Sequence, residues 1–299
     1  MKKHSFKDWF FAVRPWSFPA STMPVLDCLC LTVWYCTLKG TEYSLVNGFL
    51  AIFGIVLFHA SGNVISDYFD HKTGVDKYAT DKPLTNESFT PKEFLILGSV
   101  LFVIAVIMGF IMLWRSNISL LYVGILGSIL TLVYPFFKYR AMGDIFIFVS
   151  YAIVPILGTS IVVGQQVNMN SLIALAIPVG LITVAILHAN NIRDIVTDNK
   201  ANIRTFAGII GKKASIYLYH VEILLPYIYV VIMAILGLLP YMSLLVFISL
   251  PIALKNSKQM QQVFINTEMV VGMDGNTAKL QMIFSLLLSA GIVIETILL

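Results

Sequence analysis

The chain has 299 residues, of which 58% are apolar and only 12% are charged. Soluble domains carry roughly 25% charged residues, so this composition excludes an ordinary soluble protein and indicates a polytopic membrane protein. The net charge of +4 does not indicate nucleic-acid binding, because the basic residues follow the topology of a membrane protein.

Apolar windows occur along the whole chain, and most are close to the ~20 residues that cross a hydrocarbon core. They predict an all-α membrane protein with about nine transmembrane helices around a central cavity. The windows are 17–38, 46–66, 93–114, 118–135, 143–164, 170–190, 214–237, 240–254 and 277–298. The N-terminal segment MKKHSFKDWFFAVRPW has no cleavable-signal pattern and predicts an amphipathic stretch at the membrane interface.

The basic residues predict the orientation of these helices. With nine spans and a cytoplasmic N-terminus, all of the 20 Lys and Arg residues except Lys39 and Arg115 fall in cytoplasmic segments. This distribution obeys the positive-inside rule, and an error of one span would scatter the charges over both faces. The N-terminus is therefore predicted to be cytoplasmic.

Two similar acidic motifs follow the second and the sixth window. Their residues are Asn63, Asp67 and Asp70 in the first motif, and Asn190, Asn191, Asp194 and Asp198 in the second. Residues three and four apart share one face of a helix, so each motif forms a polar stripe if its helix continues past the window. Both windows end at the same membrane face, and the two stripes could therefore confront each other across a cavity.

The chemistry of these motifs points to a metal ion and a phosphate group. A carboxylate at the centre of a membrane helix costs on the order of 2.5–3.5 kcal/mol, and grouped carboxylates also repel one another. Mg²⁺ suits carboxylates that share it with phosphate oxygens. The basic residues near the motifs that could bind phosphate are Lys72, Lys77, Lys82, Arg193, Lys200 and Arg204. Solvated charges at helix ends are the alternative for either motif alone.

In several segments the chain resembles the UbiA superfamily of intramembrane prenyltransferases. The segments are RPWSFPASTMPVL (14–26), NVISDYFDHKTGVD (63–76), YPFFKYRAMGDIFIFVSYAIVPILGT (134–159), IPVGLITVAILHANNIRDIVTDNKANIRTFAGIIG (177–211) and GNTAKLQMIFSLLLSAGI (275–292). The resemblance implies one prenyltransferase domain over 1–299, with nine helices and two Asp-rich motifs that bind a prenyl diphosphate through Mg²⁺. Within the superfamily, the chain is most similar to the branch that prenylates 1,4-dihydroxy-2-naphthoate in menaquinone synthesis.

The resemblance also implies roles for individual residues. The implied metal ligands are Asp67, Asp70, Asp194 and Asp198, with Asp76 as a weaker candidate. Implied partners near the diphosphate or the acceptor are Asn63, Asn190, Asn191, Tyr134, Lys138, Arg140, Arg204, Lys77 and Arg14. Arg14 is expected to meet the carboxylate of the acceptor. Two positions depart from the family: Gly74 stands where many relatives have a third acid, and Lys82-Pro83 replaces an Arg-Pro pair.

The implied reaction is Mg²⁺-dependent transfer of a polyprenyl group from polyprenyl diphosphate to 1,4-dihydroxy-2-naphthoate, with loss of CO₂, giving demethylmenaquinol. The implied location is the bacterial cytoplasmic (inner) membrane, with the active site open toward the cytoplasm. Alternatives within the superfamily are other acceptors: 4-hydroxybenzoate, a glycerol-phosphate lipid or haem. An ion-coupled transporter is a further alternative, although transporters place their sites near the midplane rather than at one face.

Two acids within the predicted spans, Asp27 and Glu222, match no motif of the family, and His188 has two possible roles. Asp27 either faces the cavity or bonds to a neighbouring helix, and Glu222 is interpreted as structural. His188 is either a base or a packing residue. The sequence leaves these roles, the prenyl chain length and the oligomeric state open.

Overall fold

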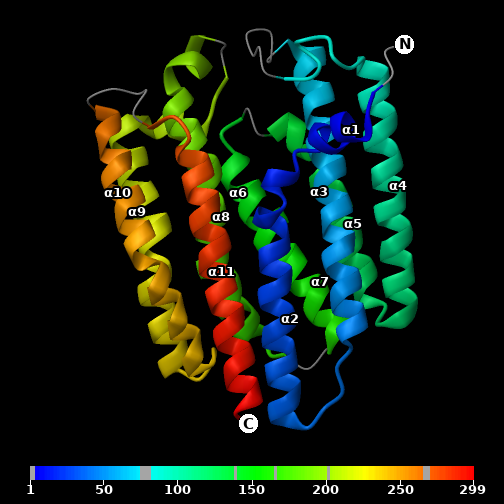
Figure 1. The fold of residues 1–299 in the computed structure, drawn as a ribbon, viewed down its shortest axis with the longest axis vertical. Helices are drawn as coiled ribbons and strands as arrows, with labels where there is room; N and C mark the ends of the chain where they lie inside the picture. The colour runs from blue at the N-terminus through cyan, green and yellow to red at the C-terminus, as the bar shows by residue number, and fades with distance from the viewer. Residues whose placement is uncertain (1–3, 75–81, 138–139, 165–166, 201–202, 265–269) are drawn as a thin grey trace.

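The structure is a computed structural model that describes residues 4–74, 82–137, 140–164, 167–200, 203–264 and 270–299. Over these ranges the chain is all-helical, without a β-strand, which confirms the predicted fold class (Figure 1). The helices are α1 (Phe6–Ala12), α2 (Pro19–Lys39), α3 (Leu45–Thr73), α4 (Pro91–Arg115), α5 (Ser119–Phe137), α6 (Gly143–Phe148), α7 (Val154–Val163), α8 (Met169–Lys200), α9 (Phe206–Ile235), α10 (Leu250–Gln261) and α11 (Met273–Ile297). A π-helical turn, Val149–Ile153, joins α6 to α7.

Seven segments of the described chain are long and apolar enough to cross a membrane. They are Pro15–Lys39, Leu45–Thr73, Pro91–Arg115, Gly143–Val163, Met169–Asn199, Phe206–Ile235 and Met273–Ile297. The other two predicted windows correspond to the shorter apolar helix α5 and to a segment that begins as a 3-10 helix, Tyr241–Ser249, and continues as α10. The protein is therefore a multi-pass membrane protein, whereas the count of nine spans and the cytoplasmic N-terminus stay predictions.

A glycine sets the packing of this 3-10 segment against α11. A Cβ atom at Gly291 would lie 2.0 Å from the carbonyl oxygen of Met242, so only glycine permits this approach. The Met242 amide donates a hydrogen bond of 2.7 Å to the carboxylate of Glu295 on α11. The two backbones are thus in direct contact, and any side chain at position 291 would force them apart.

We expect Gly291→Ala to lower the free energy of unfolding by about 1–3 kcal/mol, the usual cost of overpacking a well-packed interior. The measurement is the thermal midpoint of the purified protein in detergent. Gly275→Ala is the matched control, because a Cβ atom at position 275 of the same helix meets no other atom within 4 Å. Equal midpoints for the two variants would contradict this interpretation of the contact.

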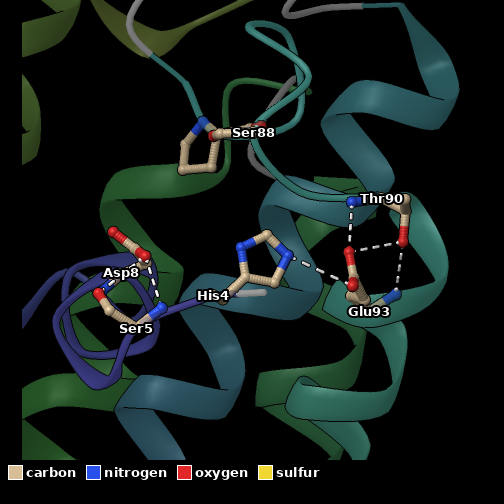
Figure 2. Close-up of polar contacts among 7 residues, drawn as sticks. His4, Ser5, Asp8, Ser88, Thr90 and Glu93 are labelled. Carbon is tan, nitrogen blue, oxygen red and sulfur yellow. Dashed lines mark hydrogen bonds and ion pairs between the residues drawn. The ribbon is translucent and has the colours of Figure 1, made fainter. Parts of the chain in front are cut away.

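The short helix α1 lies across the end of the bundle where α3 ends and α4 begins (Figure 1). Figure 2 shows how it is attached: the His4 ring lies 3.3 Å from the carboxylate of Glu93, the residue that completes the capping box of α4. In α1 itself, hydrogen bonds from the Ser5 amide and hydroxyl lower the pKa of Asp8. Phe6 is 85% exposed, which supports the predicted placement of this segment at the membrane interface.

Candidate active site

The first acidic motif lies on the last turns of α3. The helix continues past the predicted window to Thr73, so Asn63, Asp67 and Asp70 are helical, as their spacing predicts. Asp67 and Asp70 are each only 2% exposed. The helix ends at Gly74, whose φ of 75° is a left-handed conformation that favours glycine. The position at which many relatives carry a third acid is therefore the C-cap of the helix in this chain.

Two cations contact the carboxylates of this motif. The Arg14 guanidinium forms an ion pair with Asp67. The Lys82 Nζ lies 3.5 Å from the Asp67 Oδ1 and 3.7 Å from the Asp70 Oδ2. Arg14 precedes α2 and Lys82 follows α3 in the chain, so two separate segments bring positive charge to one helix end. In this structure the Arg14 guanidinium meets a motif carboxylate. Its contact with an acceptor stays a prediction.

Asn63 on α3 forms hydrogen bonds with the segment that joins α1 to α2. Its side-chain nitrogen donates hydrogen bonds of 3.0 Å to the Val13 carbonyl oxygen and the Ser17 hydroxyl. One turn earlier, the His59 ring lies within 3.2 Å of the Ser17 hydroxyl and within 2.7 Å of the Ser21 hydroxyl. Sequence reasoning missed His59, although its position four residues before Asn63 places it on the same helix face.

The second motif lies on the last turns of α8, which continues to Lys200. The Arg193 guanidinium donates two hydrogen bonds to the Asp194 carboxylate, of 2.8 and 2.7 Å, and a third to the Asn190 side-chain oxygen. It also lies 3.5 Å from the carboxylate of Asp274 at the start of α11. Asn191 is buried and Asp198 is half-buried. Sequence reasoning did not identify Asp274, which only the helix packing brings to this motif.

Three other predicted site residues, Tyr134, Arg140 and Arg204, lie outside the helices α3 and α8 that carry the motifs. Arg140 and Arg204 are exposed and adjacent, since the amide of Ala141 donates a 2.7 Å hydrogen bond to the Arg204 carbonyl oxygen. Tyr134, near the end of α5, lies close enough to Asp70 to be influenced by its charge. Asp76, Lys77 and Lys138 fall outside the described residues.

Asp27 bonds to a neighbouring helix. It is fully buried and accepts a 2.6 Å hydrogen bond from the Ser289 hydroxyl on α11. Of the two alternatives left open by the sequence, this contact supports the structural one.

A polar cavity of about 170 Å³ lies beside the first motif. Its polar lining includes Arg14, His59, Asn63, Tyr134 and Tyr151. It adjoins an apolar groove of about 360 Å³ between α3, α4, α5 and α7. Four residues line both spaces: Ile55, Phe58, Thr131 and Ser150.

The groove opens at the surface of the bundle. Phe110 and Ile129, which line it, are 59% and 51% exposed. A surface of this kind on a membrane-spanning helix faces hydrocarbon. The arrangement offers one place for a charged head group and, next to it, one for an apolar chain.

Comparison with known proteins identifies the family to which this chain belongs. The model of the UbiA prenyltransferase family matches residues 28–263. A UbiA prenyltransferase domain-containing protein 1 homolog from Drosophila melanogaster is 33% identical over 291 residues, which cover 94% of this chain and 78% of the fly protein. Because this relative is eukaryotic, the predicted bacterial inner membrane is not supported.

Solved structures show the same fold at low sequence identity. A digeranylgeranylglyceryl phosphate synthase superimposes with a TM-score of 0.61 at 16% identity, over 96% of this chain and 99% of the synthase. A UbiA homolog from Archaeoglobus fulgidus, solved with DMAPP and Mg²⁺, gives a TM-score of 0.58 at 13% identity, over 94% of this chain and 99% of that one.

Proposed function

This chain belongs to the UbiA prenyltransferase family, and from that premise we propose that its two acidic motifs and Mg²⁺ hold a prenyl diphosphate beside an acceptor in the polar cavity. The chain is a prenyltransferase by family membership. The proposal takes residues 1–299 as a single domain. The observation that carries it is the junction of a polar cavity at the first motif with an apolar groove that opens toward lipid.

The donor set of the motifs fits Mg²⁺. Asp67 and Asp70 supply hard oxygen ligands from α3, and we assign the same role to Asp194, Asp198 and Asp76. The positive charges of Arg14 and Lys82 beside Asp67 support a place for cations at this motif. When bound, Mg²⁺ would neutralise the diphosphate and stabilise it as the leaving group. The solved Archaeoglobus homolog with DMAPP and Mg²⁺ supports this choice of metal and donor.

The basic residues of the site would bind the diphosphate head. Arg14 and Lys82 lie at the motif carboxylates, where they can exchange these partners for phosphate oxygens. We assign further phosphate contacts to Lys77, Lys138, Arg140 and Arg204. Negative charge accumulates on the departing diphosphate, so these cations stabilise the transition state more than the bound substrate.

The apolar groove would hold the prenyl chain. Its lining excludes water from the allylic carbon, which would otherwise be hydrolysed as positive charge develops there. The rings of Phe58, Tyr134 and Tyr151 line the polar cavity next to this carbon and can stabilise the positive charge.

Gly124 offers a test of the groove. It lies ten residues before Tyr134 on α5, or about 15 Å along the helix axis. A Cβ atom at this position meets no other atom within 4 Å, so Gly124→Leu should fill the groove without distorting the helix. We expect the KM for geranylgeranyl diphosphate to rise about tenfold, the cost of displacing one or two methylene-sized groups. The KM for the shorter geranyl diphosphate should stay unchanged, and an equal rise for both donors would contradict the assignment.

The acceptor we favour lacks a carboxylate. The resemblance implied 1,4-dihydroxy-2-naphthoate, with Arg14 expected at its carboxylate, and the Arg14 guanidinium pairs with Asp67. Apart from Arg14, whose charge Asp67 balances, the polar cavity presents neutral groups, among them Tyr151 and the hydroxyl-bonded ring of His59. These suit the hydroxyl groups of an aromatic ring, whereas a carboxylate would need a further cation. Formation of demethylmenaquinol from the naphthoate, with loss of CO₂, is thus the second choice.

A competition assay in liposomes tests this proposal. Protein, Mg²⁺ and geranylgeranyl diphosphate are offered 1,4-dihydroxynaphthalene, ring-deuterated 1,4-dihydroxy-2-naphthoate, 4-hydroxybenzoate and a glycerol-phosphate lipid, and the products are identified by mass spectrometry. The deuterium label is needed because both naphthalene acceptors would give the same prenylated ring. We expect the unlabelled naphthalene product to dominate. A dominant deuterated product would reverse the choice of acceptor, and no prenylated product from any of the four would refute the proposal.

A further inference from the structure

A second group of metal-ligand side chains contains no residue of the acidic motifs. Asp144 at the start of α6, His188 on α8 and Glu222 on α9 place one ligand atom each within 4.8 Å of the other two. The His188 Nδ1 lies 3.2 Å from the Asp144 Oδ2 and 3.3 Å from the Glu222 Oε1. Their exposed fractions are 9%, 0% and 3%, so the group is buried between three helices.

The charges of this group do not balance within the described chain. Neither Asp144 nor Glu222 forms an ion pair with a described Lys or Arg; their charged partner is His188 alone. With both carboxylates ionised, a protonated imidazole would leave one uncompensated negative charge in a buried place, which is unfavourable. A divalent cation with a neutral imidazole would balance the two carboxylates.

The hydrogen bonding of the group is also incomplete. The Asp144 Oδ1, the Glu222 Oε2 and the His188 Nε2 are buried and have no hydrogen-bond partner among the described residues. Buried side-chain polar atoms have such a partner in the large majority of cases. The second oxygens of both carboxylates thus have capacity left for a bound ion or for a water molecule that the ion carries, which points to a ligand in this group.

The ligand types favour zinc over magnesium, because an imidazole with two carboxylates suits zinc better. Two ligands about 2.0–2.1 Å from a zinc ion, at the tetrahedral angle, lie about 3.3 Å apart. The 3.2 and 3.3 Å from the His188 Nδ1 to the two carboxylate oxygens are hydrogen-bond distances that are also compatible with this spacing.

We infer that Asp144, His188 and Glu222 bind one zinc-type divalent ion, separate from the Mg²⁺ proposed at the acidic motifs. Three protein ligands leave a fourth coordination position for water. The ion would cross-link α6, α8 and α9 at a point one to two turns before Asp194. Its binding would thus fix the helix that carries the second motif.

Metal analysis of the purified full-length protein tests this site without an activity assay. The protein in detergent is incubated with Zn²⁺ and dialysed against metal-free buffer, and its zinc content is measured by elemental mass spectrometry. We expect about one retained equivalent of zinc per chain. His188→Asn and Glu222→Gln should weaken retention on the order of 100-fold, since loss of even an outer-shell partner costs 10–100-fold in affinity. Asp67→Asn should retain zinc as the wild type does, which separates this site from the proposed Mg²⁺ site.

His220→Asn is the matched control. His220 lies on the same helix as Glu222, two residues away, and contacts the Ser257 hydroxyl at 3.1 Å. This variant should keep its zinc. Failure of the folded wild type to retain any zinc would overturn the inference, and so would equal retention by His188→Asn and His220→Asn. If the His188 and Glu222 variants do not fold, the wild-type protein loaded with Co²⁺ instead of zinc provides a second test. A visible absorption spectrum of tetrahedral cobalt would support the site. The absence of this spectrum would refute it.

Discussion

Replacing Asp67 with asparagine is expected to abolish prenyl transfer while the helical bundle stays folded. The amide removes one carboxylate from the proposed metal site and leaves Arg14 and Lys82 without their shared charged partner. We expect kcat/KM to fall at least about 10³-fold, which corresponds to roughly 4 kcal/mol of transition-state stabilisation. The measurement is the rate of diphosphate release from geranylgeranyl diphosphate.

The control for this variant is Glu87→Gln. Glu87 is an exposed acid on the segment that also carries Lys82, so its replacement removes the same charge from the same end of the bundle. Its activity should match that of the wild type. Wild-type activity in a folded Asp67→Asn protein would remove the first motif from the proposed active site.

Asp194→Asn is expected to cause a loss of similar size through the second motif. Asp194 accepts two hydrogen bonds from Arg193, so its carboxylate is held in one orientation for a metal ion. The variant should show at least about a 10³-fold fall in kcat/KM, together with a higher Mg²⁺ requirement. Steady-state rates measured over a series of Mg²⁺ concentrations give both quantities.

Asp274→Asn separates two explanations of that result. Asp274 contacts the same Arg193 guanidinium, at 3.5 Å, but belongs to neither motif. If Asp194 acts as a metal ligand, the Asp274 variant should lose less than about tenfold, as expected for a partly exposed ion pair. Equal losses in the two variants would mean that Asp194 only holds Arg193 in place.

Local sequence spacing was sufficient to predict the two acidic stripes. The intervals of three and four residues from Asn63 to Asp70, and from Asn190 to Asp198, require only that α3 and α8 continue by a few turns, which they do. The apolar windows likewise predicted every long helix, because length and apolarity are properties of the contiguous chain.

Contacts between distant segments could not be predicted in this way. The ion pair of Arg14 with Asp67 depends on a left-handed turn at Arg14, with a φ of 57°, and no local pattern indicates this conformation. Asp144, His188 and Glu222 come from three helices and meet only when these pack. The 3-10 segment before α10 lies close to α11 at Gly291, and the hydropathy of the segment does not indicate this contact.

The acceptor was the least predictable feature of the site. The acidic motifs are proposed to recognise the diphosphate and the metal, which the resemblance gives for the whole superfamily. The residues proposed to lie beside the acceptor are spread over several segments: Arg14 precedes α2, His59 lies on α3 and Tyr151 lies between α6 and α7. The packing of these helices decides which groups would face an acceptor, and for this reason the resemblance to the naphthoate branch did not determine the substrate.

The most direct test of the central claim is diphosphate release from geranylgeranyl diphosphate as a function of added Mg²⁺. The wild-type protein is reconstituted in liposomes with 1,4-dihydroxynaphthalene after dialysis against magnesium-free buffer. We expect release to be undetectable without Mg²⁺, to rise to saturation as Mg²⁺ is added, and to stay at background in Asp67→Asn. Release that is equally fast without any divalent cation, or absent at every Mg²⁺ concentration in a folded sample, would contradict the assignment of the acidic motifs.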